Sequence, residues 1–223
     1  ASLKDYENIK IQTDTFKDMK DISELINQIT GIYKKDINEI IDRSLSSITY
    51  SGSVVGRYAF AECRSLATVN LPNATTISNN AFGSCTSLNN VSMPNVTEIG
   101  SWVFQRCGFS QIPNESNILN IGPGAFQECP NLTSINLTSC QYINSNTQGG
   151  ATVGAFLSCS NLTNVNIPEC LKIGIYTFAS CYNLANVSAP KLTNVSTSAF
   201  YNCSNLTSIN IPEGVTSIGN SAF

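Results

Sequence analysis

The sequence predicts a β-rich solenoid of about eight stacked 22-residue turns, preceded by an N-terminal α-helical cap. Three observations predict this fold: phenylalanines that recur with a period near 22, a cysteine three residues after the first seven of them, and a Leu and a Val or Ile that follow six and nine residues after most of them. The phenylalanines are Phe60, Phe82, Phe104, Phe126, Phe156, Phe178, Phe200 and Phe223. A single unit of this length cannot bury its own apolar face, so the units must stack on one another.

Each unit approximates one consensus, I-G-x-x-A-F-x-x-C-x-x-L-x-x-V-x-L-P. The L-x-x-V-x-L segment predicts a short strand with inward apolar residues, and the Pro after it ends the strand. The G-x-x-A-F-x-x-C segment has the spacing of a single helical or 3₁₀ turn, which we expect on the opposite wall. The predicted fold is therefore mixed, mostly β with short helical or 3₁₀ turns.

Two places depart from the consensus. After Cys107 the expected Leu and Val are missing, and the Pro comes three residues early, at Pro113. We expect an irregular strand there, with Phe109 filling the gap. Between Phe126 and Phe156 the repeat carries eight extra residues around NSNTQGGA, and such an excursion is expected on the surface, where it tolerates function.

The first 46 residues differ in composition from the rest. Residues 1–44 carry seven of the twelve basic side chains and nine of the fifteen acidic ones. Apolar residues recur at helical spacing between Ile22 and Ile41, so residues 17–43 predict an amphipathic helix. This helix is either a cap over the first turn, which solenoids need, or a coiled coil that oligomerises the protein. The predicted domains are thus residues 1–46 and 47–223.

The repeat resembles the BspA-like, Treponema-type leucine-rich repeat. The resemblance rests on segments such as SNLTSINIPEGVTSIGNSAF and on the seven in-phase cysteines, and it covers residues 54–223. It implies a right-handed leucine-rich-repeat superhelix in a bacterial surface protein, with some relatives acting as adhesins toward host matrix proteins or other bacteria. The resemblance also extends to proteins encoded by prophages of gut bacteria, which contain similar repeats.

Composition argues against several classes of function. A net charge of −3 is unlike a nucleic-acid-binding surface, and no run approaches the ~20 apolar residues that span a bilayer, so we expect neither nucleic acid nor membrane insertion. The absence of histidine excludes a catalytic triad with an imidazole base. Glu62 and Glu128 share a position in the repeat, but two repeats separate them, so they are not a catalytic carboxylate pair. We therefore expect no enzyme and no cofactor.

The nine cysteines predict packing rather than chemistry. The chain has no C-x-x-C pair, so we expect no metal site, although one or two disulfides or a metal remain alternatives to free thiols. Seven in-phase thiols should form an internal column of small apolar side chains, and Cys140 and Cys170 should also point inward. Replacing Cys129 by Ser would then bury a hydroxyl without an evident partner.

Candidate partner-binding residues fall into three groups. Outward positions of the predicted strands form a ladder of amides and hydroxyls that includes Asn136 and Asn166. Aromatic residues recur two positions before Phe, at Tyr58, Trp102 and Tyr176, with Tyr201 nearby. Asn146 and Gln148 lie in the polar insertion. For the ladder the alternative is a solubilising sheet face, and for the aromatics it is ordinary packing.

These observations predict a non-catalytic bacterial leucine-rich-repeat protein, extracellular or on the cell surface, that mediates adhesion-like binding to a protein or glycan on a host or bacterial surface. The alternative is a phage- or prophage-encoded virion component that contacts the bacterial surface. A second copy of the chain is a further candidate partner. Because the sequence stops inside the repeat motif at Phe223, we expect the natural chain to continue, or this end to be covered by another copy.

Overall fold

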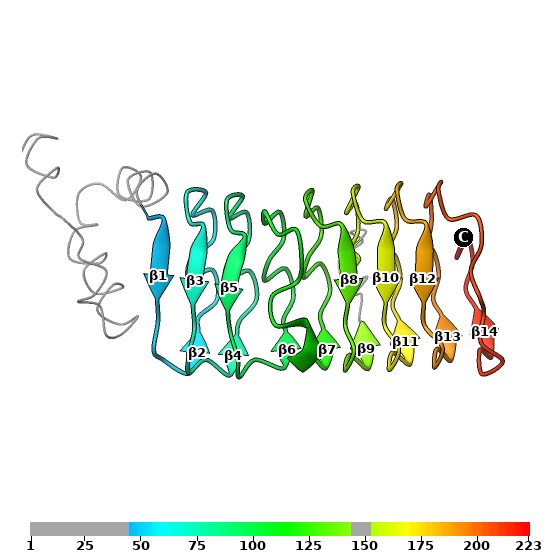
Figure 1. Ribbon diagram of the computed structural model, residues 1–223, viewed down its shortest axis with the longest axis horizontal. Coiled ribbons are helices and arrows are strands. Elements are labelled where there is room, and N and C mark those ends of the chain that lie inside the picture. Colours follow the sequence, from blue (N-terminus) through cyan, green and yellow to red (C-terminus); the bar gives the residue numbers. More distant parts are fainter. Residues whose placement is uncertain (1–44, 144–152) are drawn as a thin grey trace, which may run out of the picture.

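The computed structural model describes residues 45–143 and 153–223, which form the predicted solenoid. The predicted helix at 17–43 and most of the polar insertion, with Asn146 and Gln148, lie outside the described residues. Short strands lie in two rows along the molecule, one above the other in Figure 1, and the chain alternates between the rows as it advances from turn to turn. The predicted β-rich superhelix is thus confirmed.

The first row contains the predicted L-x-x-V-x-L strands. They pair in parallel with an offset of one repeat, so that Val69 lies opposite Val91 and Val165 opposite Val187. Because side chains alternate along a strand, the central residue of each strand points into the core and its two neighbours point outward. The strands of this row are β1 (Ser47–Thr49), β3 (Thr68–Asn70) and β5 (Asn90–Ser92), then β8 (Ser134–Asn136), β10 (Asn164–Asn166) and β12 (Asn186–Ser188).

The second row of strands is a feature that the sequence analysis did not anticipate. Each has two residues, and seven of the eight end five residues before a phenylalanine; β9 ends thirteen residues before Phe156 because the insertion follows it. In most of them an outward residue is followed by an inward aliphatic one, as in Thr76 and Ile77. The strands are β2 (Val54–Val55) and β4 (Thr76–Ile77), then β6 (Glu98–Ile99), β7 (Asn120–Ile121), β9 (Tyr142–Ile143), β11 (Lys172–Ile173), β13 (Asn194–Val195) and β14 (Ser217–Ile218). In the sequence most of these strands are marked by a polar residue followed by an aliphatic one at a fixed position of the repeat. The prediction had assigned this pair to the turn.

The segment around each phenylalanine forms a series of turns. Backbone bonds join residues three apart, as from Ala81 N to Ser78 O and from Cys85 N to Phe82 O, which is the pattern expected for a 3₁₀ turn. Residues two before and two after most phenylalanines, such as Asn80 and Ser84, have φ near +60°. These left-handed residues separate the turns and prevent a continuous helix from forming.

The core is built around a stack of phenylalanine rings. Neighbouring rings lie 5.4–5.7 Å apart between centroids and are close to parallel, from Phe60 to Phe223. Phe126 and Phe156 keep this spacing at 5.5 Å although eight extra residues separate them in the sequence. The insertion therefore leaves the core stack intact.

The irregular turn after Cys107 splits the first row of strands into two sheets, β1-β3-β5 and β8-β10-β12. Phe109 fills the gap as predicted: it is completely buried and packs edge-on against Phe104, at 5.2 Å between ring centroids. A 3₁₀ helix, η3 (Glu115–Asn117), follows the positions at which the strand is missing. The side chain of Asn114, itself left-handed with φ 54°, accepts a hydrogen bond from Met93 N at 2.9 Å. An amide oxygen thus takes the place of the strand carbonyl that would pair with β5.

Asparagine side chains connect successive turns at their corners. Nδ2 of Asn95 donates to Pro72 O at 2.8 Å, and Nδ2 of Asn161 donates to Pro130 O at 2.8 Å. Asn183 repeats the contact with Ser160 O at 2.9 Å. The abundance of asparagine in the repeat therefore has a structural cause, since its amide reaches a backbone carbonyl of the preceding turn.

Candidate binding surfaces

The cysteines are internal, as predicted. All nine are free thiols in the structure; eight are buried, and Cys203 is half-buried. The in-phase thiols also have a role that the sequence analysis missed, because each of the six from Cys85 to Cys203 donates to the carbonyl of the phenylalanine in the preceding turn. Examples are Cys129 Sγ to Phe104 O at 3.2 Å and Cys181 Sγ to Phe156 O at 3.2 Å. The expectation that a hydroxyl at position 129 would have no partner is therefore wrong, since an acceptor lies within reach.

Burial makes these thiols unreactive. It raises the pKa of Cys159 to about 12 and that of Cys170 to about 11. The same desolvation raises the pKa of Cys129 and Cys181 well above the usual value. A thiolate is the nucleophile and the metal ligand, so neutral buried thiols suit neither role. Among residues 45–143 and 153–223 no group of His, Cys, Asp and Glu side chains is arranged to hold a metal ion.

The structure brings the predicted ladder residues Asn136 and Asn166 together. They lie on the outer face of β8 and β10, where Nδ2 of Asn166 donates to Oδ1 of Asn136 at 2.7 Å. A parallel contact joins Asn186 Nδ2 to Asn164 Oδ1 at 2.9 Å. Asn164, Asn166 and Asn186, but not Asn136, line a shallow groove of about 630 Å³ over β8, β10, β12 and residues 208–210. The face is polar and uncharged, and its amides are partly satisfied by one another.

The predicted aromatic residues do not form one cluster. Tyr58, Trp102 and Tyr176 share one position in the repeat, but they lie in different turns, two and then three turns apart. All three have left-handed backbones, with φ between 54° and 59°. Tyr58 and Tyr201 expose more than half of their surface, whereas Trp102 and Tyr176 are half-buried. The ring of Trp102 lies against Gly124 of the next turn, where a Cβ would come within 2.4 Å of its Cδ1.

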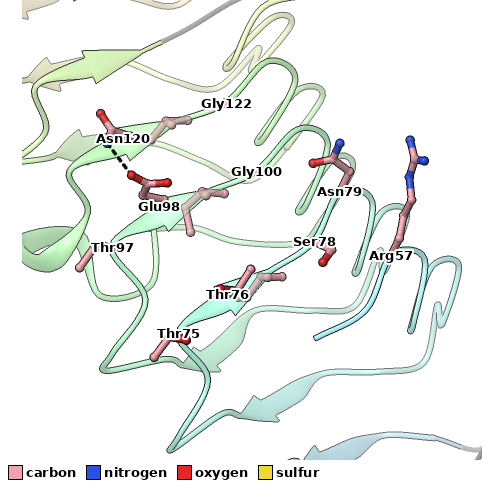
Figure 2. A pocket seen from close by; sticks show the side chains of 13 residues that line it. Arg57, Thr75, Thr76, Ser78, Asn79, Thr97, Glu98, Gly100, Asn120 and Gly122 are labelled. Carbon is pink, nitrogen blue, oxygen red and sulfur yellow. Dashed lines mark hydrogen bonds between the residues drawn. The ribbon is translucent and has the colours of Figure 1, made fainter. Parts of the chain in front are cut away.

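A second groove lies on the outer face of β4, β6 and β7, where no candidate residue was predicted. Its volume is about 720 Å³. Figure 2 shows Glu98 and Asn120 on neighbouring strands, joined by a hydrogen bond of 3.1 Å, with Arg57 and Asn79 at the other end. The remaining polar lining consists of Thr75, Thr76, Ser78 and Thr97. The groove could not be predicted from the sequence without the second row of strands, because only that row places these positions on one outward face.

Carboxylates elsewhere pair with cations on adjacent turns. Arg106 Nε lies 2.7 Å from Glu128 Oε2, and Lys191 Nζ lies 2.6 Å from Glu169 Oε2. The hydrogen bond from Arg106 is the main cause that lowers the pKa of Glu128. Glu62 and Glu128 remain in separate turns and form no pair. Within the part of the chain that the structure describes, no helix is long and apolar enough to cross a membrane.

The family model of the BspA-type leucine-rich repeat region matches six copies of the repeat over residues 53–149 and 152–223. The chain belongs to this BspA-type family. Among solved structures, a leucine-rich repeat protein from Bacteroides ovatus has 20% identity and a TM-score of 0.57 over 77% of the chain. One from Eubacterium ventriosum has 19% identity and a TM-score of 0.59 over 81% of the chain.

The leucine-rich repeat protein of T. pallidum has 23% identity and a TM-score of 0.50 over 78% of this chain and 73% of its own. The chain spans only 51% of the Bacteroides protein and 58% of the Eubacterium protein. No curated protein matches the sequence. At these identities the BspA-type neighbours establish the fold, and function depends on the surfaces described above.

Proposed function

We propose that this BspA-type protein acts outside the producing cell, on its surface or secreted, as a non-catalytic, adhesion-like binding protein for a protein or glycan. The observation that carries the proposal is the family match over residues 53–149 and 152–223, since this repeat forms almost all of the described structure. A solenoid presents long, regular faces on which weak contacts can be repeated from turn to turn. Such faces suit an extended partner better than a small substrate.

The surfaces support binding without chemistry. Both grooves are shallow, and the polar part of their lining consists mainly of hydroxyls and amides. Glu128 and Glu169 pair with cations on adjacent turns, and the hydrogen bond from Arg106 lowers the pKa of Glu128, so that this carboxylate is a poor proton donor. The sequence contains no histidine to serve as an acid or base near neutral pH. The groups that remain are suited to hydrogen bonding and stacking.

The thiols are compatible with an extracellular location. Oxidation requires an accessible thiolate, and burial raises the pKa of Cys140 and Cys159 to about 12. A chain with nine free cysteines can therefore remain reduced in an oxidising environment without forming incorrect disulfides. The free thiols are therefore no obstacle to a location outside the cell.

The proposal makes two claims, a location outside the cell and a binding role, and the purified chain with antibodies against it tests both. Antibodies against the purified chain should label intact producing cells, and labelling should not increase markedly after permeabilisation. Purified protein should also bind saturably to host cells, bacterial cells or an array of matrix proteins and glycans, with heat-unfolded protein as the control. Labelling confined to permeabilised cells would contradict the location, and recovery with released phage particles would replace it by a virion. Absence of saturable binding to every surface would contradict the binding role.

A further inference from the structure

The groove over β4, β6 and β7 has the lining of a site for an uncharged, hydrogen-bonding ligand. The hydroxyl-bearing residues Thr75, Thr76, Ser78 and Thr97 line it together with Asn79 and Asn120. One cation, Arg57, and one anion, Glu98, complete the polar lining, so the groove carries no net charge. A charged ligand would meet its own sign of charge at one end.

Two polar side chains of the groove are held in place by hydrogen bonds and still have a donor or an acceptor atom available. Glu98 Oε1 accepts from Asn120 Nδ2 at 3.1 Å, and Asn79 Oδ1 accepts from Ser101 N at 3.1 Å. Within the described residues these contacts leave Oε2 of Glu98 and Nδ2 of Asn79 without a protein partner. One fixed acceptor and one fixed donor therefore face the groove, which is the complement that a hydroxyl-bearing ligand requires.

The groove lies where the second row of strands is interrupted. β2 and β4 form one sheet, β6 and β7 begin another, and the lining residues come from both sides of this break. Ile77, Ile99 and Ile121 contribute backbone to the groove, but their side chains are buried in the core, with at most 3% exposure. The groove thus offers backbone and polar side chains, without an apolar pocket for the anchoring side chain of a peptide.

Two aromatic residues lie close in the chain to residues that line this groove, although neither is itself part of the lining. Tyr58 follows Arg57, whose guanidinium carbon lies 5.4 Å from the centre of the tyrosine ring. Trp102 follows Gly100 by two residues, and its ring lies on Gly124, two residues beyond Gly122. The two aromatic positions are two turns apart, about 10 Å at the usual strand spacing.

The backbone gives no reason for aromatic residues at these positions. Tyr58 and Trp102 have φ of 59° and 54°, in the left-handed region that is costly for bulky side chains. Other turns place Asn80, Gly124 and Ser198 at the same position, and Asn and Gly tolerate this conformation far better; Tyr176 is a third aromatic residue at this position, outside the groove. Strain of this kind points to a role for the side chain at the surface.

We propose that this groove binds a neutral, extended oligosaccharide. Sugar rings stack on Trp102 and Tyr58, and sugar hydroxyls bond to Glu98, Asn79 and the threonines between them. A sugar combines an apolar ring face with a periphery of donors and acceptors, so it fits both parts of the site, which neither an ion nor an apolar peptide does. The inference rests on the extracellular binding role and specifies its ligand class.

The test uses the full chain and an array of neutral oligosaccharides, namely cello-, xylo-, manno- and galacto-oligosaccharides, followed by titration calorimetry with those that bind. Thr76→Arg blocks the groove and should weaken binding at least about tenfold, a loss of about 1.4 kcal/mol. Ser217→Arg makes the same change at the same repeat position on β14, outside the groove, and should leave affinity within about twofold. Trp102→Gly should lower affinity similarly without lowering the melting temperature, and Trp102→Tyr should restore much of the binding.

Two results would overturn the groove site. One is the absence of binding to every neutral oligosaccharide on the array. The other is an equal loss of affinity in Thr76→Arg and Ser217→Arg. If the protein still binds cells or matrix proteins in either case, the extracellular binding role stands and only the sugar ligand fails. If Trp102→Gly unfolds the protein, its ring is structural, and the Thr76→Arg comparison decides the site alone.

Discussion

At the scale of single residues, the cysteine column shows why the repeat prefers this side chain. A thiol is small and apolar enough for the core, and it can still donate to a carbonyl of the preceding turn, as Cys129 does to Phe104 O. The same carbonyl also accepts from Cys107 N at 3.2 Å, so the thiol provides a second bond rather than the only one. Each of the six in-phase cysteines from Cys85 to Cys203 therefore fills the core and also connects two turns.

This geometry predicts the ranking of two substitutions. Cys129→Ser keeps a donor opposite Phe104 O and should reduce the free energy of unfolding by about 1 kcal/mol or less, whereas Cys129→Ala loses the donor and leaves a small cavity, for a loss of about 1–2 kcal/mol. Denaturant unfolding of both variants measures the difference. The control is Cys140, whose thiol contacts Tyr142 O of its own turn at 3.6 Å, and where another turn has Ala74. There Ala should be at least as stable as Ser. If the serine and alanine variants had the same order of stability at both sites, the proposed role of the hydrogen bond from the Cys129 thiol would be contradicted.

At the scale of elements, the irregular turn shows how one repeat lacks its strand without weakening the stack. Phe109 supplies the apolar volume, and it also lies 6.3 Å from the ring of Phe126. Asn114 supplies the acceptor that β5 would otherwise lack, since its Oδ1 lies 2.9 Å from Met93 N. Its left-handed backbone aims the side chain at that amide, and asparagine tolerates this conformation well. Volume and hydrogen bonding are thus replaced by two separate residues.

We expect Asn114→Ala to lower the free energy of unfolding by about 1–3 kcal/mol, because it leaves Met93 N without its acceptor and places alanine in the left-handed region. Asn114→Asp keeps an acceptor oxygen and should lose less. Asn114→Gly removes the backbone strain but leaves Met93 N without its acceptor, so its loss of stability should fall between those of the alanine and aspartate variants. Chemical denaturation of the three variants gives the order, and alanine equal to aspartate would show that the side-chain acceptor is unimportant.

At the scale of the whole molecule, the buried thiols couple stability to alkaline pH. Their pKa is raised in the folded chain, to about 12 for Cys140 and about 11 for Cys170, while in the unfolded chain it is near the usual value of about 8.5. A raised folded pKa gives stability that is complete below the unfolded value and is lost as pH rises toward the folded value. The structure therefore predicts a loss of stability that begins near pH 9 and continues to about pH 11–12.

Melting temperature measured from pH 7 to pH 11 tests this coupling. Between its unfolded and folded pKa values, each buried thiol should lower the free energy of unfolding by up to about 1.4 kcal/mol per pH unit. The double variant Cys140→Ala and Cys170→Ala removes two thiols at a position where other turns have Ala74 and Val96, so its decline above pH 9 should be shallower than that of the parent. Parallel curves for the two proteins would show that other groups, such as tyrosine and lysine, govern the alkaline loss.

The sequence by itself determined the repeat, its phase and its core. Phe, Cys, Leu and Val recur at fixed intervals, and stacking is the only way to bury them, so the solenoid, the internal thiols and the filling role of Phe109 could all be predicted. It also placed Asn136 and Asn166 on one outward face, because they share a repeat position on strands that had to pair.

Only the tertiary structure decided what the turns do to one another. Three features depend on backbone geometry that residue types alone do not specify. They are the bonds from six in-phase thiols to a carbonyl one turn away, the left-handed backbones of Tyr58 and Trp102, and the second row of strands. The groove over β4, β6 and β7 has the same origin. Its lining comes from four successive turns, at positions that are ordinary polar residues in each repeat, and it forms where the ladder of paired strands is interrupted. A one-dimensional pattern gives the phase of each residue, whereas a groove depends on how neighbouring turns pack in three dimensions.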